Sequence, residues 1–283
     1  MKKNISPLRY PGGKAKIYNM IVELMERNKI TGTTYIEPFA GGCGLALLLL
    51  KNQVVEKLIL NDIDKGIYCF WQSVLKYNEE FCDRILGVEI SVEERKKERE
   101  IYINKDNIDI MKKENILKLG LATFYLNRVN RSGVLKAGVI GGKNQTGNYK
   151  IDCRFNKKTL ILKIKEIEKM KNKIEFYNYD VIEFINEVLK QESKDSFVFL
   201  DPPYYSKGPE LYTNFYKYED HRFLANHIKE IEQKWIVTYD NNEEIKKIFK
   251  EYTQVEFDIS YSLEKKKKSK EVMIFDKKIE KIV

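Results

Sequence analysis

Five short apolar segments recur along the chain, and each ends in an acidic residue or a proline followed by a turn signal. They are TTYIEPF (33–39), KLILND (57–62), KIEFYNYD (173–180), SFVFLDPP (196–203) and KWIVTYD (234–240). Such runs are typical of parallel strands buried on both faces. Segments with helical periodicity lie between them, over 17–27, 44–51, 157–170, 181–189 and 220–233. The alternation predicts an α/β fold with a doubly wound sheet and a ligand site beyond the carboxyl ends of its strands.

The stretch from 64 to 156 interrupts this alternation. Its first part is helical and highly charged, as in SVEERKKEREIYINKDN, and its second part is rich in glycine. Glycine at that density predicts a β-hairpin or a long loop on a helical base. We therefore expect an inserted subdomain over 64–156, within a discontinuous domain made of 1–63 and 157–283.

Composition excludes several classes of protein. With 43% hydrophobic and 12% aromatic residues, the chain is too apolar to be disordered over most of its length. Leu45–Leu50 ends at Lys51, far short of the roughly 18 residues of a membrane span. Scattered cysteines and two histidines predict neither a disulfide nor a metal site. The net charge of +9 predicts a polyanionic partner.

The first strand leads into a glycine loop, Glu37-Pro38-Phe39-Ala40-Gly41-Gly42-Cys43-Gly44, which opens the next helix. Glycines allow a ligand to approach the backbone closely, and a helix N-terminus exposes N–H donors. The loop therefore suits a nucleotide-like cofactor, although a tight turn without a ligand explains this motif equally well.

Asp62 follows the second strand, about 20 residues beyond the glycine loop. A carboxylate at this spacing accepts hydrogen bonds from ribose hydroxyls in dinucleotide sites. The alternative role is to cap the next helix. Because Asp64 lies two residues further on, one acid is present for each role.

Asp201-Pro202-Pro203-Tyr204-Tyr205 follows the strand SFVFL and is the most specific motif. The prolines stiffen the backbone and contribute no N–H, so carbonyls around them remain acceptors. A carboxylate and a fixed carbonyl beside an aromatic ring suit an exocyclic amine on a flat base stacked on Tyr204. A simple chain-reversing turn is the weaker alternative, because the glycine loop precedes the motif in the same sheet pattern.

Four motifs in this order resemble those of the DNA adenine-N6 methyltransferases that include the Dam enzymes: RYPGGK (9–14), YIEPFAGGCG (35–44), NDID (61–64) and FLDPPYY (199–205). The order resembles the family's alpha group, in which a recognition domain lies between the cofactor motif and DPPY. The resemblance covers essentially the whole chain. It implies a Rossmann-like S-adenosylmethionine-dependent methyltransferase sheet, with 64–156 as the target-recognition subdomain.

The resemblance also implies S-adenosylmethionine as methyl donor, without a metal. The cofactor-binding residues it implies are Tyr10, Lys14, Glu37, Pro38, Phe39, Gly41, Gly42, Gly44, Asp62, Asp180 and Asp201. Asp180 is the match for the acid that contacts the cofactor's adenine, and Asp195 is its rival. Tyr10 stands where many members have Trp or Phe, and its ring offers a face to the sulfonium.

The implied catalytic residues are Asp201, Pro202, Pro203 and Tyr204. A target adenine flipped out of duplex DNA would stack on Tyr204, with its N6 hydrogens held by Asp201 and the Pro202 carbonyl. These bonds would aim the nitrogen lone pair at the sulfonium methyl, so that positioning supplies most of the catalysis.

Duplex DNA with a short specific site is the implied partner of the inserted segment. Its side chains suit guanine at Arg128 and Arg131, and adenine at Asn127 and Asn130. Phosphate contacts are expected from Lys136, Lys143, Lys150, Arg154, Lys157 and Lys158. Taken singly, each of these residues is better explained as part of a solvated surface. The segment lacks the NGxxRxN pattern of GATC-specific Dam members. Specificity for GATC is therefore not predicted.

Three further segments have more than one interpretation. Lys265–Lys268 and Lys270 are expected near the tip of a C-terminal β-hairpin, as phosphate contacts or as solvated charge. Val92–Arg99 is expected to be an exposed helix face with opposite charges. The aromatic residues Phe215, Tyr216 and Tyr218 either cover the site or fill the core.

A site-specific DNA adenine-N6 methyltransferase is the leading hypothesis. Its rivals are methylation of another planar amine, in RNA or in a release factor, and a non-catalytic DNA-binding module with a decayed site. We expect a soluble cytoplasmic protein of a bacterium or phage, associated with the nucleoid. A cognate restriction endonuclease is a candidate partner, but the sequence does not decide whether one is paired with it. The sequence predicts neither the recognition site nor the oligomeric state.

Overall fold

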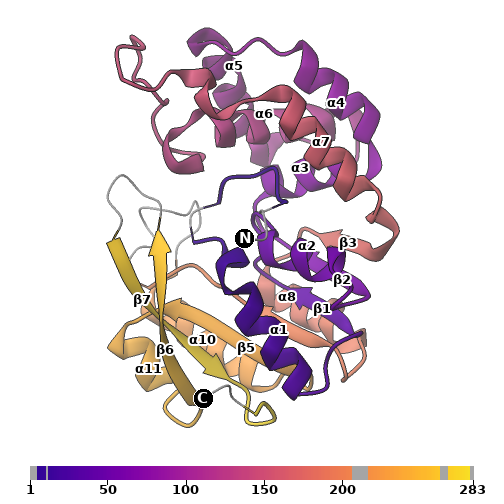
Figure 1. Ribbon diagram of the computed structural model, residues 1–283, viewed down its shortest axis with the longest axis vertical. Coiled ribbons are helices and arrows are strands. Elements are labelled where there is room, and N and C mark those ends of the chain that lie inside the picture. The colour runs from indigo at the N-terminus through magenta and orange to yellow at the C-terminus, as the bar shows by residue number, and fades with distance from the viewer. Residues whose placement is uncertain (1–4, 11, 206–215, 262–266, 281–283) are drawn as a thin grey trace. The chain divides into compact units, whose positions relative to one another are not determined.

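The computed structural model describes residues 5–10, 12–205, 216–261 and 267–280, and they divide into two units (Figure 1). The helical unit comprises residues 1–11 and 63–178, and the sheet unit comprises residues 12–62 and 179–283. The helical unit thus contains the whole predicted insert and extends beyond it at both ends.

Six strands are described in the sheet unit, in the order β2-β1-β4-β5-β7-β6. Their bounds are β1 (Thr34–Glu37), β2 (Lys57–Asn61), β4 (Phe197–Leu200), β5 (Lys234–Asp240), β6 (Thr253–Tyr261) and β7 (Lys267–Phe275). The neighbours β2, β1, β4 and β5 are parallel, whereas β7 is antiparallel to both β5 and β6. This mixed and mostly parallel sheet confirms the predicted α/β fold, and each predicted apolar run contains a strand.

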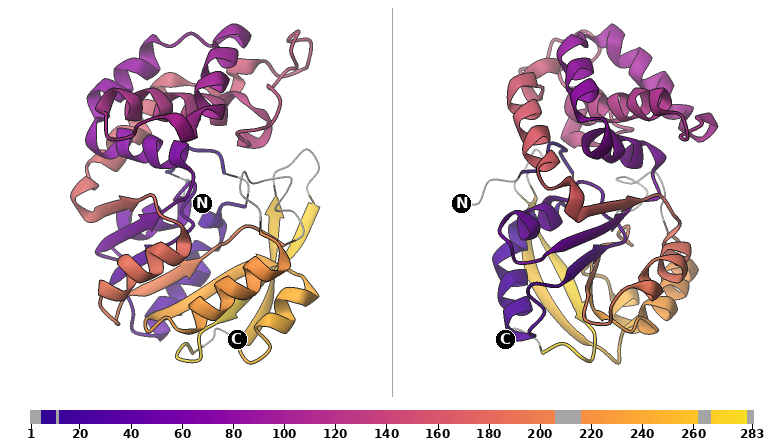
Figure 2. Two further views of the ribbon diagram at one scale, coloured as in Figure 1. Left: turned by 180° about the vertical axis from the view of Figure 1, so that it is seen from behind. Right: turned by 90° about the vertical axis from the view of Figure 1, so that its right-hand side faces the viewer.

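Helices cover both faces of this sheet. They are α1 (Tyr18–Arg27), α2 (Gly44–Lys51), α8 (Val181–Glu187), α10 (Tyr218–Lys229) and α11 (Glu243–Ile248). Figure 2 shows α1 and α2 on one face and α8 and α10 on the other. All six residues of Leu45–Leu50 are buried, so this apolar run is a core helix that ends where Lys51 reaches solvent.

The parallel strands end at one edge of the sheet, which collects acidic side chains. Glu37 ends β1, Asp62 follows β2, Asp201 follows β4 and Asp240 ends β5. Because parallel neighbours share their direction, the register brings these four carboxyl groups to the same edge.

The helical unit contains α3 (Lys65–Lys76), α4 (Asn78–Gly87), α5 (Val92–Ile103), α6 (Lys113–Val129), α7 (Lys157–Glu168) and the strand β3 (Ile174–Tyr177). The helices α3 and α6 pack closely at Gly120, where a methyl group would lie 2.8 Å from the carbonyl oxygen of Cys69. Asp64 caps α3 by accepting the N–H groups of Gly66 and Ile67. The exposed Lys97 of α5 pairs with Glu94, as predicted for a charged helix face, whereas Glu98 of the same segment is buried.

Residues 130–155 form a long loop, and the β-hairpin expected here was wrong. A single antiparallel bridge joins Asn130 to Val139, and the remaining regular structure is two short 3-10 turns, Arg131–Gly133 and Ile151–Arg154. Left-handed backbone angles at Ser132, Gly133, Gly141, Gly142 and Gln145 turn the chain repeatedly. A strand cannot continue through such turns, because it needs extended residues.

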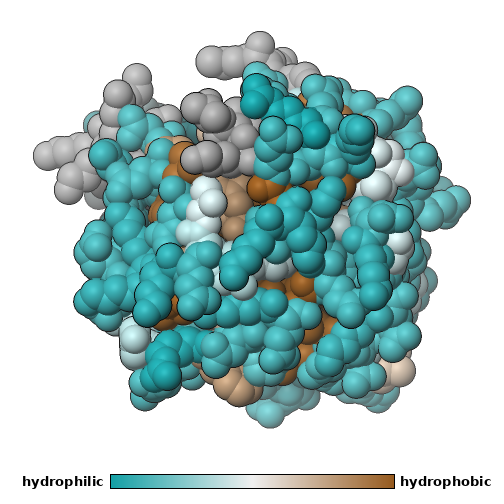
Figure 3. Space-filling view, turned by 90° about the horizontal axis from the view of Figure 1, so that it is seen from below, coloured by the Kyte–Doolittle hydropathy of each residue, from teal (hydrophilic) through white to brown (hydrophobic). Residues whose placement is uncertain are grey.

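The C-terminal hairpin was predicted correctly, since β6 and β7 pair over their whole length. Its tip, with Lys265 and Lys266, lies outside the described residues. Within the described part of the chain, no helix is long and apolar enough to cross a membrane. The face in Figure 3 is mainly hydrophilic, and its apolar side chains form small separate areas.

Candidate active site

The glycine loop is held open by its own backbone angles and by Asp62. Gly41 and Cys43 both have positive φ, of 45° and 50°, and Cys43 stands at the N-cap of α2. The N–H of Gly41 donates to the Asp62 carboxylate at 2.9 Å. Asp64 caps α3, so Asp62 is not needed there. The binding of ribose hydroxyls by Asp62 stays a prediction.

Asn61 connects the glycine loop to the segment before Asp180, and no role was expected for it from the sequence. Its side chain is 1% exposed and makes three hydrogen bonds. The amide donates to the carbonyls of Pro38 and Tyr179, both at 3.1 Å, and accepts the N–H of Tyr179 at 2.9 Å. This residue therefore holds the glycine loop and the segment before Asp180 together.

Asp180 is exposed and caps α8 by accepting the N–H of Ile182. Its rival, Asp195, precedes β4 and therefore lies toward the opposite edge of the sheet from Asp201. The geometry favours Asp180 as the acid nearer the site.

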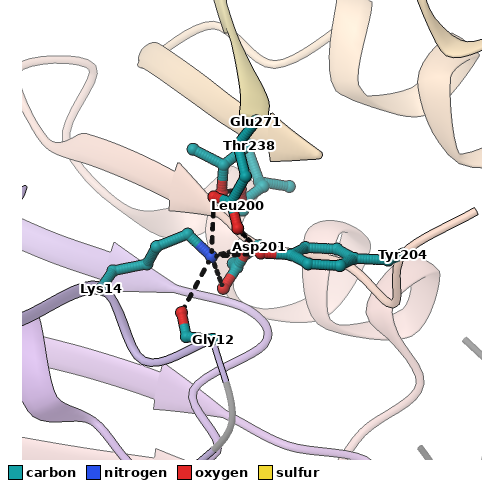
Figure 4. A network of polar contacts seen from close by, with 7 residues as sticks. All are labelled: Gly12, Lys14, Leu200, Asp201, Tyr204, Thr238 and Glu271. Atoms are coloured by element: carbon teal, nitrogen blue, oxygen red, sulfur yellow. Dashed lines mark hydrogen bonds and ion pairs between the residues drawn. The ribbon is translucent and has the colours of Figure 1, made fainter. Parts of the chain in front are cut away.

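Asp201 is the centre of a polar network (Figure 4). Both of its carboxylate oxygens lie 2.6 Å from the Nζ of Lys14, and Thr238 donates to Oδ1 at 2.7 Å. The Asp201 side chain is 17% exposed, whereas that of Lys14 is 2% exposed. The carboxylate is thus fixed from behind by two protein donors and keeps one side toward solvent.

The three donors of Lys14 are used inside the protein. They go to Asp201, to the carbonyl of Gly12 at 3.2 Å and to the hydroxyl of Tyr204 at 3.0 Å. Burial opposes the charge, but the carboxylates of Asp201 and Glu271 outweigh it and raise the pKa of Lys14. The structure therefore shows Lys14 holding Asp201, and the predicted contact of Lys14 with a cofactor stays a prediction.

Glu37 is a buried acid without a hydrogen-bond partner at Oε2 among the described residues. Burial, with smaller contributions from Asp201 and Asp62, raises its pKa well above the usual glutamate value. A buried acceptor left without a partner is rare and indicates a missing donor or cation. The edge of the sheet thus suits a positively charged ligand.

Aromatic side chains surround the DPPY motif. Pro202 is buried, and the ring of Tyr204 is 2% exposed, so it is not an open stacking surface in this conformation. The N–H of Tyr205 donates to Asp240 at 2.9 Å. The ring of Tyr216 meets the ring of Phe39 edge-on. Burial, and to a smaller extent the negative charge of Asp180, raises the pKa of Tyr216. Tyr216 is therefore part of the site, and Phe215 lies outside the described residues.

The predicted DNA-reading residues include three whose polar groups are used inside the helical unit. Asn127 is 1% exposed and exchanges two 2.8 Å hydrogen bonds with the backbone of Arg9. Asn130 is fully buried and accepts from Arg95 at 2.7 Å. Arg128 donates to the carbonyl of Arg154, and burial lowers its pKa to about 10. The assignments of these three residues to bases are therefore corrected to structural roles.

Six further members of the set are exposed: Arg131, Lys136, Lys143, Lys150 and Arg154 on the loop, and Lys158 at the start of α7. Lys157 instead donates to the carbonyls of Leu86 and Val88 at the end of α4. Tyr10 belongs to the helical unit, whereas the other predicted cofactor residues belong to the sheet unit.

Sequence analysis missed Asn61, Thr238 and Glu271. Each is a polar residue inside an apolar strand run, namely KLILND, KWIVTYD and EVMIF, and each is buried. A polar side chain at a buried strand position needs a partner. The sequence indicated that each of these three residues needs a polar partner, but it did not indicate which residue that partner is.

An open glycine loop, an acid-lined sheet edge and a DPPY motif on a mostly parallel sheet define the protein as a methyltransferase. Residues 10–271 match the family described as D12 class N6 adenine-specific DNA methyltransferase, and the chain belongs to this family. It is therefore an adenine-specific DNA methyltransferase.

Two relatives are named as type II methyltransferases. The chain is 26% identical over 220 residues to the type II methyltransferase M.MjaIII of Methanocaldococcus jannaschii, covering 75% of this chain and 73% of the relative. It is 24% identical over 239 residues to the type II methyltransferase M.CviBI of Paramecium bursaria Chlorella virus NC1A, covering 81% of each. A solved structure, the proposed RNA methyltransferase PH1948 of Pyrococcus horikoshii, superposes with a TM-score of 0.46 at 12% identity, covering 98% of this chain and 89% of the other.

Proposed function

We propose that this protein transfers a methyl group from S-adenosylmethionine to N6 of an adenine flipped out of a specific site in duplex DNA. The observation that carries the proposal is the geometry of Asp201. Its carboxylate lies at the carboxyl edge of the sheet, directly before two prolines, and is fixed by Lys14 and Thr238 while remaining 17% exposed.

The residues at the sheet edge fit the cofactor. When bound, S-adenosylmethionine supplies a methyl group on a positively charged sulfur. The Oε2 atom of Glu37, which has no hydrogen-bond partner within the described part of the chain, suits a cation, and Asp62 suits the ribose hydroxyls. The glycine loop, Phe39 and Asp180 complete the set that would hold the cofactor.

Asp201 has acceptor capacity for the target amine. A carboxylate offers about four acceptor positions, and Lys14 and Thr238 make three contacts with it. The remaining position takes one N6 hydrogen, and the Pro202 carbonyl takes the other. The nitrogen lone pair would form the bond to the methyl group as the bond between that group and sulfur breaks, leaving neutral S-adenosylhomocysteine, and the surplus proton would leave to Asp201 or to solvent. Stacking on Tyr204 requires that binding uncover its ring.

Recognition of the site is assigned to the loop of residues 130–155. Its exposed basic side chains suit phosphates, and Arg131 is the remaining candidate for reading a guanine. The names of the two type II relatives support pairing with a restriction endonuclease.

The test is a labelled-methyl assay with duplex DNA, RNA and protein as acceptors. Label is expected on N6 of adenine in DNA, and sequencing that detects modified bases then gives the recognition site. Asp201→Asn is expected to lower the rate at least 1000-fold, because the amide replaces one acceptor oxygen with a donor, is neutral and cannot take up the proton, while Asp195→Asn serves as the matched control. Label on RNA or protein alone would refute the proposal.

A further inference from the structure

Glu271 of β7 connects the C-terminal hairpin to the network around Asp201 (Figure 4). Its side chain is fully buried, and its Oε2 lies 3.7 Å from the Nζ of Lys14. In the sheet, Glu271 stands opposite Asp240 of β5. A fully buried carboxylate requires partners, and those of Glu271 belong to the active site.

The hydrogen bonds in this network have only one possible direction. An ammonium group only donates and a carboxylate only accepts. The Tyr204 hydroxyl therefore accepts from Lys14 and donates its own hydrogen to Glu271. Glu271 thus orients the phenol of the DPPY motif and, through it, one of the three donors of Lys14.

The charges in the network are unequal, because one ammonium faces two carboxylates at short range. Lys14 lies between Asp201 and Glu271, with the hydroxyl of Tyr204 beside it. Without Glu271, Asp201 would balance the charge of Lys14 alone and would be held more tightly by it. An amine that needs the same carboxylate would then compete less well.

We propose that Glu271 is a positioning residue for methyl transfer: it anchors Lys14 and Tyr204 so that Asp201 remains available to the target amine. The proposal rests on the proposed function of Asp201 as the acceptor for N6. Glu271 itself does not touch the substrate, and it acts through the two side chains to which it is bound.

The test is Glu271→Gln, which keeps the shape of the side chain and removes its charge. The single-turnover methylation rate at saturating DNA and cofactor is expected to fall 10- to 100-fold. The dissociation constants for duplex and cofactor are expected to stay within about threefold of wild type, because the defect lies in alignment. Asp276→Asn is the control, since Asp276 is a buried acid just after β7 and is not part of this network.

A second variant keeps the proposal testable if Glu271→Gln folds poorly. Tyr204→Phe retains all charges and removes only the hydroxyl that links Lys14 to Glu271, so a fall of at least fivefold is expected. In the double variant the two losses of methylation rate should not multiply, because both substitutions break the same hydrogen-bonded link between Glu271 and Lys14. A wild-type rate in either single variant, or fully multiplicative losses, would overturn the proposal. The same assay on the wild-type protein shows separately whether adenine in DNA is methylated at all, which tests the proposed function itself.

Discussion

Replacing Asn61 with alanine tests whether one buried amide assembles the cofactor site. The change removes three hydrogen bonds and leaves the carbonyls of Pro38 and Tyr179 and the N–H of Tyr179 without their partner. At about 1 kcal/mol net for each bond, the free energy of unfolding should fall by about 3 kcal/mol. At roughly 2–4 °C per kcal/mol, the melting temperature should fall by roughly 6–12 °C.

The chain offers a matched control in Asn28. This buried asparagine also makes three hydrogen bonds, donating to the carbonyls of Leu24 and Glu280 and accepting the N–H of Glu280. It lies at the end of α1, and these hydrogen bonds reach neither the glycine loop nor the segment before Asp180. Asn28→Ala should therefore lower the melting temperature by a similar amount.

The two variants should differ in cofactor binding, measured by calorimetry well below both melting temperatures. Asn61→Ala should weaken binding about tenfold, which corresponds to about 1.4 kcal/mol, because the glycine loop and the Asp180 segment lose their common anchor. Asn28→Ala should bind as tightly as wild type. Equal affinities in the two variants would show that Asn61 only stabilises the fold, and an unchanged melting temperature in Asn61→Ala would refute the energetic argument itself.

Burial lowers the pKa of His221 to about 4. Since an unfolded histidine gains its proton near pH 6.5, stability should fall as pH drops below that value, by roughly 2 kcal/mol at pH 5; His221→Phe should flatten this part of a urea-midpoint profile. Gly133 and Gly142 both have φ of +78°, but a methyl group at Gly133 would lie 2.3 Å from a backbone oxygen and one at Gly142 would meet nothing. Alanine should therefore cost about 3 kcal/mol or more at Gly133 and about 1 kcal/mol at Gly142, in denaturant titrations. Arg131→Ala should relax base preference at one position of the site, whereas Lys143→Ala should weaken all duplexes and lower the salt slope by about 1.

The sequence predicted the sheet and the acids at its edge because each strand run is apolar and bounded by a turn. Asp64 caps the next helix, one of the two roles expected for this pair of acids, since aspartate is a favoured N-cap residue. Local patterns of this kind are visible in a single sequence.

The helical unit was harder to predict. Asn127 and Asn130 have the side chains of base readers, but their amides are used by the backbone of Arg9 and by the side chain of Arg95. Glu271 is far in sequence from Lys14, and the residues near each of them do not predict that the two side chains form an ion pair. Pairings over such distances are decided by tertiary packing, which spacing along the chain does not reveal.

The position of β7 has a consequence for how the enzyme is made. Lys14 is synthesised well before Glu271. At roughly 5–20 residues per second, Glu271 follows the DPPY motif by roughly 3–13 s, and during that time the motif lacks the strand that inserts beside β5. A gene truncated before β7 would encode every motif of the family and still no assembled network. Only a chain that includes β7 carries the complete set of charges around Asp201.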